Sequence, residues 1–164
     1  MKSAPKKTLF IVSLCTLGVI MGLILSLLLQ SFGIRKVTGE SMEPNLRANQ
    51  FIALKKVENN TQFDYNDIVA FDGIRDTDVY IKRIIGKPGD TIEFINGQLY
   101  RNNIKTYESY VKYPDNITMP KITLDKDEYF CCGDNRPVSV DCRSFGAIKK
   151  KQIKEKLRKK EEKR

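Results

Sequence analysis

The chain contains no histidine and no tryptophan. Without histidine there can be no Ser-His-Asp triad, because that arrangement needs an imidazole as its general base. A serine nucleophile in this protein would therefore need another base. A lysine whose charge is removed by burial is a suitable candidate.

Cysteine is also scarce, with four residues, too few for a disulfide framework. There is no CxxC pair and no Cys/His cluster, so we expect no metal site and no cofactor. Cys15 lies in an apolar segment and is expected to pack as a small hydrophobic residue. A bridge between Cys132 and Cys142 is conceivable in an oxidising compartment. The neighbours Cys131 and Cys132 would point to opposite faces of a strand.

Positive charge is abundant but concentrated at the two ends. Of the net charge of +9, residues 149–164 contribute +7 and the first seven residues +3. Residues 8–148 carry 16 basic and 17 acidic side chains, so we do not expect this part to bind nucleic acid. The C-terminal segment is most simply a solvated end, partly helical or frayed. Attraction to an anionic membrane or wall polymer is a second interpretation.

One long hydrophobic run is present near the N-terminus. Leu9–Leu29 is a stretch of 21 uncharged residues, enough for a helix to cross a hydrocarbon core of roughly 30 Å. Lys2, Lys6 and Lys7 precede it, which favours an inside N-terminus with the rest of the chain outside. A cleavable signal peptide is the alternative, but the run is longer than usual and no small-x-small site closes it. We expect an uncleaved, single-pass anchor in the cell membrane.

After the apolar run the chain reads mostly as β-strands. Short apolar or alternating segments predict strands at 51–57, 67–71, 79–85, 91–95, 98–100 and 128–132. Asn96-Gly97 predicts a tight hairpin turn, because both residues tolerate a positive φ. Residues 101–125 have mixed polarity and two prolines, and are expected to be rich in loops. No long helical period occurs here, so the fold class is mostly β, sandwich- or barrel-like, behind one N-terminal helix.

Two residues suggest chemistry. Ser41 lies just past the apolar run, and Lys82 lies between apolar residues near the end of a predicted strand. Burial there could leave the lysine neutral, so that it could act as base to the serine. Each residue also has a plain structural interpretation: Ser41 could cap a turn, and Lys82 could extend past apolar neighbours into solvent.

A third stretch, Gly133–Gly146, follows the last predicted strand and is dense in polar residues. Such a run can be an ordinary charged loop. It could also form buried ion pairs and supply a hydroxyl that orients a lysine.

Together these features make the chain resemble the type I signal peptidases, the bacterial membrane-bound Ser/Lys endopeptidases. Four stretches match in the family's order: Gly39–Pro44, Asp67–Phe71, Tyr80–Asp90 and Gly133–Gly146. The single predicted span and the short 101–125 segment are more like Gram-positive members than the two-span Gram-negative ones. The resemblance implies a serine protease that removes signal peptides after small-x-small sequences.

The resemblance also implies roles for individual residues. Ser41 matches the nucleophile, and its backbone N–H would donate to the oxyanion. Lys82 matches the general base, and Ser139 matches a hydroxyl that orients it. Nine further residues match supporting and pocket positions. The supporting set is the ion pairs Asp141 with Arg143 and Asp134 with Arg83, and Met42 packed under the nucleophile. The pocket set, for small side chains at the first and third positions before the cut, is Val37, Ile52, Ala70 and Ile81.

The chain departs from the family pattern at three places. Cys142 replaces the usual Ser, and Gly39 stands where some members place a second oxyanion hydroxyl. The family usually continues with another strand after Gly146, where this chain turns into a lysine-rich segment.

The resulting expectation has three parts. Residues 1–35 are the cytoplasmic N-terminus and anchor. Residues 36–148 are the extracytoplasmic catalytic domain, with a small insertion over 93–125, and residues 149–164 are a basic tail. The expected partners are secretory or surface precursors and membrane lipid, and nothing points to an oligomeric state. The alternative from another class is an inactive homologue that assists assembly of surface proteins such as pilins. A self-cleaving Ser/Lys repressor-type domain is disfavoured, because DNA-binding helices are absent.

Overall fold

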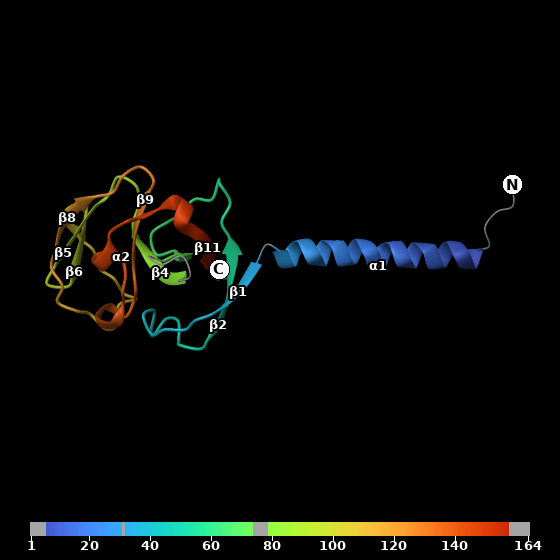
Figure 1. The fold of residues 1–164 in the computed structure, drawn as a ribbon, viewed down its shortest axis with the longest axis horizontal. Helices are drawn as coiled ribbons and strands as arrows, with labels where there is room; N and C mark the ends of the chain where they lie inside the picture. The colour runs from blue at the N-terminus through green and yellow to red at the C-terminus, as the bar shows by residue number, and fades with distance from the viewer. Residues whose placement is uncertain (1–5, 31, 74–78, 158–164) are drawn as a thin grey trace.

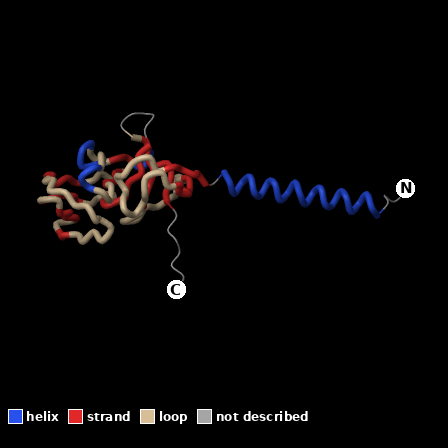
Figure 2. The backbone as a smooth tube through the Cα atoms, turned by 90° about the horizontal axis from the view of Figure 1, so that it is seen from below, coloured by secondary structure: helices blue, strands red, loops and turns tan. Residues whose placement is uncertain are grey.

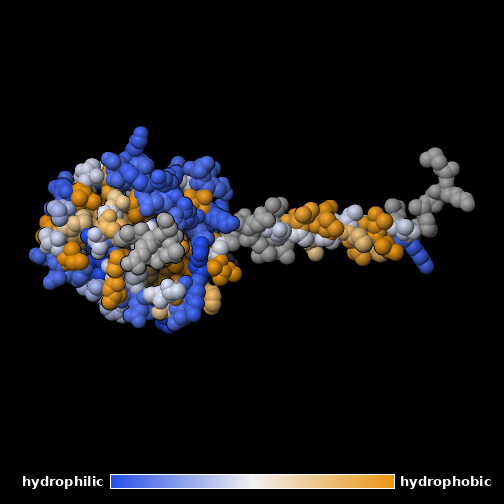
Figure 3. Space-filling model, in the orientation of Figure 1, coloured by the Kyte–Doolittle hydropathy of each residue, from blue (hydrophilic) through white to orange (hydrophobic). Residues whose placement is uncertain are grey.

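The computed structural model describes residues 6–30, 32–73 and 79–157. A long N-terminal helix projects away from a β-rich body, as Figure 1 shows. The helix, α1, runs over Lys6–Gln30, and hydrophobic residues lie along it in Figure 3. Large apolar side chains from Phe10 to Ile24 are exposed on it. Among the described residues, no helix qualifies as long and apolar enough to cross a membrane. The predicted helix is present, and its predicted span across a membrane stays a prediction.

The larger sheet has seven described strands, and each neighbouring pair is antiparallel. Their spatial order is β1-β2-β11-β3-β4-β9-β10. Their bounds are β1 Phe32–Lys36, β2 Phe51–Lys56, β3 Ile68–Asp72, β4 Val79–Gly86, β9 Glu128–Cys132, β10 Ile148–Lys149 and β11 Ile153–Leu157. The strands predicted at 51–57, 67–71, 79–85 and 128–132 are therefore confirmed within one or two residues.

The smaller sheet has the order β7-β6-β5-β8 and lies at the end of the body away from α1 (Figure 1). Its strands are β5 Thr91–Ile95, β6 Gln98–Arg101, β7 Ile104–Lys105 and β8 Met119–Thr123. The predicted hairpin joins β5 to β6, and Asn96 and Gly97 have φ values of 49° and 78°. Both lie in the left-handed region that a type I′ turn requires at its two central residues.

The core lies between the two sheets. Ile84 and Phe130 of the larger sheet and Phe94 of the smaller sheet have no exposed surface and belong to one apolar cluster. A second cluster on the β2–β3 side includes Met42 and Leu54. The helices of the described body are short: η1 Arg136–Val138, α2 Cys142–Phe145 and η2 Lys150–Gln152. Loops make up much of the β-rich body in Figure 2, with helical segments confined to small pieces outside α1.

The expectation of a solvated tail from residue 149 is wrong for Ile153–Leu157. This segment forms β11, which lies between β2 and β3 and pairs with both. Ile153 and Glu155 point inward and are buried, while Lys154 between them is exposed. The Glu155 carboxylate accepts two hydrogen bonds from the Arg35 guanidinium, at 2.8 and 3.2 Å. β11 therefore joins β2 to β3 within the larger sheet, and the ion pair from Arg35 of β1 compensates the burial of the Glu155 carboxylate.

Candidate active site

Ser41 lies in a tight turn segment between β1 and β2. The backbone of Val37 closes this segment at its base, since its N–H donates to Gln50 at 2.8 Å and its carbonyl accepts from Asn49 at 2.7 Å. Met42 has 1% of its surface exposed and anchors the turn in the second apolar cluster. The Leu46 N–H donates to the Met42 carbonyl at 2.9 Å, and this hydrogen bond closes the turn that follows Ser41. The neighbouring Ser41 is thereby held partly exposed at a fixed place.

Lys82 lies within β4, paired with Val69 of β3, and has only 4% of its surface exposed. Its Nζ lies 2.6 Å from Oγ of Ser41. The solvated-lysine interpretation is therefore wrong. Burial lowers the pKa of Lys82, against an opposing effect of the nearby Asp141 carboxylate. A neutral amine at this distance has the geometry to accept the serine proton.

Asp141 organises the polar stretch that faces this pair. Its Oδ2 accepts the Ser139 hydroxyl at 2.7 Å and the Gly133 N–H at 2.9 Å. The Arg143 guanidinium donates to both carboxylate oxygens, each at 2.8 Å. Burial acts to raise the pKa of Asp141, but the hydrogen bonds and charge of Arg143 outweigh it and hold this pKa below its ordinary value. The predicted Asp141–Arg143 pair is present, and Ser139 is fixed by it.

The second predicted ion pair joins β4 to the loop after β9. Arg83 donates to the two oxygens of Asp134 at 2.8 and 2.6 Å, and Asp134 is fully buried. The guanidinium also stacks over the ring of Tyr110, 4.2 Å from its centroid. Asn45, which follows the Ser41 turn, donates to Asp134 at 2.9 Å. This pair therefore ties the strand of Lys82 to the segment of Ser41.

Gly133 was missed as a site residue, although it opens the fourth matching stretch. A Cβ at this position would lie 2.2 Å from Oγ of Ser139 and 2.5 Å from the carbonyl oxygen of Ser41. That same carbonyl accepts the Asn135 N–H at 3.0 Å. The loop after β9 therefore packs directly on the backbone of the nucleophile segment, and only glycine permits this approach. A single sequence cannot distinguish this requirement from an ordinary turn glycine.

A cleft of about 490 Å³ opens beside the pair. It is lined by Ser41, Lys82, Val37 and Ile81, together with neighbours that include Val138 and Val140. Val37 and Ile81 thus reach the cleft as the resemblance implied. Ile52 and Ala70 do not line it. They are buried in the apolar cluster that also holds the cleft-lining Val37 and Met42.

The three cysteines of the β body are buried free thiols. The sulfur of Cys142 accepts the backbone N–H of Cys131 at 3.2 Å. Burial raises the pKa of the Cys131 and Cys132 thiols. The three cysteines therefore pack as small buried residues near Asp141.

Comparisons with known proteins agree with one another. The family model described as "Signal peptidase, peptidase S26" matches residues 8–159. Signal peptidase I P of Bacillus subtilis subsp. natto is 36% identical over 150 residues, covering 83% of this chain and 81% of that protein. Signal peptidase IB of Staphylococcus aureus (strain COL) is 36% identical over 136 residues, covering 71% of each chain. The crystal structure of a signal peptidase I from Enterococcus faecalis V583 matches with a TM-score of 0.51 and 30% identity, covering 60% of this chain and 98% of that one.

Proposed function

The chain belongs to the signal peptidase family, peptidase S26, and we propose that it removes signal peptides with Ser41 as nucleophile and Lys82 as general base. One observation carries the proposal. In a chain without histidine, a nearly buried lysine amine lies 2.6 Å from a partly exposed serine hydroxyl at a cleft. That is the arrangement that a two-residue acyl-transfer site requires.

The chemistry proceeds in two halves. Neutral Lys82 takes the proton of Ser41 as Oγ attacks the scissile carbonyl, and the same proton then passes to the leaving amine. The first half ends with an ester between Ser41 and the signal peptide. In the second half Lys82 takes a proton from water, which attacks the ester and frees the serine. Backbone N–H groups at the Ser41 turn would stabilise the oxyanion.

Ser139 is proposed to orient the base. Its hydroxyl proton is donated to Asp141, so its oxygen lone pairs remain able to accept a hydrogen bond from the Lys82 amine. Such a bond would turn the amine lone pair toward Ser41.

The dyad is tested by substitution in the full-length, detergent-solubilised protein acting on a precursor with a small-x-small site. Ser41→Ala, Lys82→Ala and the double variant should each lose nearly all cleavage, with little additivity, because the two residues act as one unit. Lys82→Arg should be equally inactive, because guanidinium does not deprotonate in this range. Lys55→Ala, at an exposed position of β2, is the matched control and should cleave normally. Substantial cleavage by Lys82→Ala would refute the dyad.

The substrate is proposed to be a precursor with small residues at the first and third positions before the cut. Val37 and Ile81 give the cleft apolar walls, and both pack against the cluster that holds the buried Ile52 and Ala70. Phe at the first position should therefore be cut far more slowly than Ala, since overpacking a filled wall is costly. Equal rates for Phe and Ala would contradict the pocket assignment.

We also propose that residues 1–35 hold the protein at the cell membrane as a single-pass anchor, with the β body outside. Two observations support this: the uncharged stretch Leu9–Leu29 and the exposed apolar side chains along α1. Since only the short strand β1 separates α1 from the Ser41 turn, the cleaved bond would then lie close to the bilayer. Protease added to spheroplasts should digest the β body and spare the N-terminus. Full protection of the β body would contradict this orientation.

A further inference from the structure

The loop between β7 and β8 contributes two acids with little-exposed side chains to the polar stretch behind the active site. Glu108 accepts a hydrogen bond from Nη2 of Arg136 at 2.7 Å. Asp115 forms an ion pair with Nη1 of Arg143. The side chains of both arginines are 1% exposed, and those of Glu108 and Asp115 are 8% and 9% exposed. These are interior ion pairs, so they are little screened by solvent.

Each arginine connects its acid to a group beside the dyad. Arg143 uses its remaining nitrogens on Asp141, the carboxylate that holds the Ser139 hydroxyl. Arg136 donates from Nε to the carbonyl of Gly133 at 2.9 Å. Gly133 in turn contacts the backbone of Ser41. Two chains of contacts therefore run from the smaller sheet to the catalytic pair.

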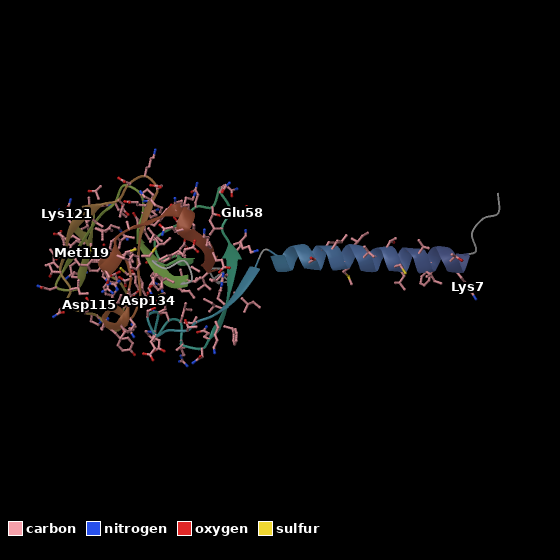
Figure 4. All side chains as sticks on the ribbon, in the orientation of Figure 1. Lys7, Glu58, Asp115, Met119, Lys121 and Asp134 are labelled. Carbon is pink, nitrogen blue, oxygen red and sulfur yellow. The ribbon has the colours of Figure 1, made fainter. Side chains whose placement is uncertain are left out.

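Asp115 is itself held by the hairpin turn of the smaller sheet. A Cβ at Gly97 would lie 1.9 Å from the carbonyl oxygen of Asp115, so the loop rests directly on this turn. The Gly97 N–H donates to the Ile117 carbonyl at 2.8 Å, and the Ile117 N–H donates to Oδ1 of Asp115 at 3.2 Å. Figure 4 labels Asp115 on the side of the body that holds the smaller sheet. The Asp115 carboxylate is thus fixed before it meets Arg143.

A buried guanidinium needs partners for all its N–H groups, and a lost partner leaves a desolvated donor. If Asp115 were neutral, Nη1 of Arg143 would lose its charged acceptor. The guanidinium would then be free to tilt, and Asp141 and Ser139 would shift with it. Since neither Asp115 nor Glu108 lines the cleft, this effect would reach the reaction indirectly, for Asp115 through Arg143.

We propose that Asp115, with Glu108 in a parallel role, is a positioning residue for peptide cleavage, so that the smaller sheet sets the geometry of Ser139 and the Ser41–Lys82 pair. This inference rests on the proposed dyad. It assigns the smaller sheet a part in catalysis: its loop fixes Arg143, which fixes Asp141 and then Ser139.

The test compares Asp115→Asn with Asp125→Asn in the full-length, detergent-solubilised enzyme. Asp125 is the matched control, because its side chain is 75% exposed and its Lys149 contact is long, at 3.7 Å. Asp115→Asn should lower kcat about tenfold, equivalent to a coupling of about 1.4 kcal/mol, and leave KM unchanged. Asp125→Asn should match the wild type in both constants. Rates are divided by the folded fraction measured by circular dichroism.

The second measurement is a double-mutant cycle with Ser139→Ala. If Asp115 acts through Ser139, then Asp115→Asn should have little further effect on kcat in the Ser139→Ala background. A purely structural role would lower the folded fraction but leave kcat per folded enzyme and the cycle unchanged. If Asp115→Asn fails to fold, Glu108→Gln gives the same test through Arg136 and Gly133.

The inference is overturned if kcat of Asp115→Asn per folded enzyme stays within about twofold of the wild type. It is also overturned if Asp115→Asn lowers kcat by the same factor in the Ser139→Ala background as in the wild type. Its failure is distinct from failure of the dyad. Substantial cleavage by Ser41→Ala or Lys82→Ala would refute the dyad, whatever the result for Asp115→Asn. If the dyad variants are inactive and Asp115→Asn cleaves at the wild-type rate, only the positioning role of Asp115 is refuted.

Discussion

Replacing Gly133 by Ala should impair catalysis far more than it impairs folding. Gly133 does not have a positive φ, so an alanine can adopt its backbone conformation without strain. The substitution therefore acts only through the added Cβ. It would lie 2.2 Å from Oγ of Ser139, 2.6 Å from Cβ of Ser139 and 2.5 Å from the carbonyl oxygen of Ser41.

The size of the effect follows from these contacts. The contact with the Ser41 oxygen is about 0.9 Å shorter than an ordinary contact of 3.4 Å. That oxygen is backbone, already bonded to the Asn135 N–H, so the loop and the nucleophile segment must move apart by nearly that amount. A displacement of about 1 Å at a reacting group can cost about 100-fold in rate. Overpacking of this kind costs about 1–3 kcal/mol in stability, which leaves most of a typical domain's stability in place.

The assay is kcat on a small-x-small precursor, with the melting temperature measured on the same preparation. Gly133→Ala should lose about 100-fold in kcat while it still unfolds cooperatively. The control is Gly18→Ala in α1, where an added Cβ meets no atom within 4 Å. If Gly133→Ala kept kcat within about threefold of the wild type, the Ser41 carbonyl would not be fixed by this loop, and the packing argument for the site would be wrong.

Two other predictions concern the base. Ser139→Ala should lower kcat by about 10–1000-fold, as expected for one positioned active-site hydrogen bond, with the melting temperature checked in parallel; unchanged turnover would exclude the orienting role. The pH dependence has a definite sign, because burial lowers the pKa of Lys82 in the folded protein. kcat/KM should fall on the acidic side as Lys82 takes up a proton. The contribution of Lys82 to the free energy of unfolding should increase with pH between its folded and unfolded pKa values, since the unfolded state binds more protons there. Removing the charge with Lys82→Met should therefore abolish cleavage yet stabilise the fold, most clearly at the acidic end, and a destabilised Lys82→Met would contradict this.

Local patterns predicted most of the β body. Short apolar runs located β3, β4 and β9, because these strands are rich in apolar residues. Asn96-Gly97 located its hairpin, because the turn depends on the positive φ of these two neighbouring residues. These strand and turn signals are contained within a few neighbouring residues. The pairing of Ser41 with Lys82 was instead expected from the absence of histidine and from the resemblance of ordered stretches to the type I signal peptidases.

What escaped prediction depends on residues far apart in sequence. β11 was missed because its inward residue Glu155 is charged, and its burial makes sense only with Arg35, 120 residues away. Ile52 and Ala70 were assigned to the cleft, yet they do not line it and are buried in the apolar cluster next to it. No local pattern distinguishes a residue of the cleft wall from a buried residue beside it.

The surroundings of Lys82 show how a lysine base can coexist with a nearby carboxylate. Burial lowers the pKa of Lys82, but the Asp141 charge acts to raise it and would favour the ammonium form. The site nevertheless needs Asp141 to hold Ser139. Arg143 relieves part of the conflict, because it binds both oxygens of Asp141 and its positive charge acts to lower the pKa of Lys82. Asp141 can therefore organise hydrogen bonds while Arg143 offsets part of its effect on the amine. Burial has the largest effect on the pKa of Lys82 and the Arg143 charge acts in the same direction, and the loop that supplies Asp115 to Arg143 belongs to the same electrostatic arrangement.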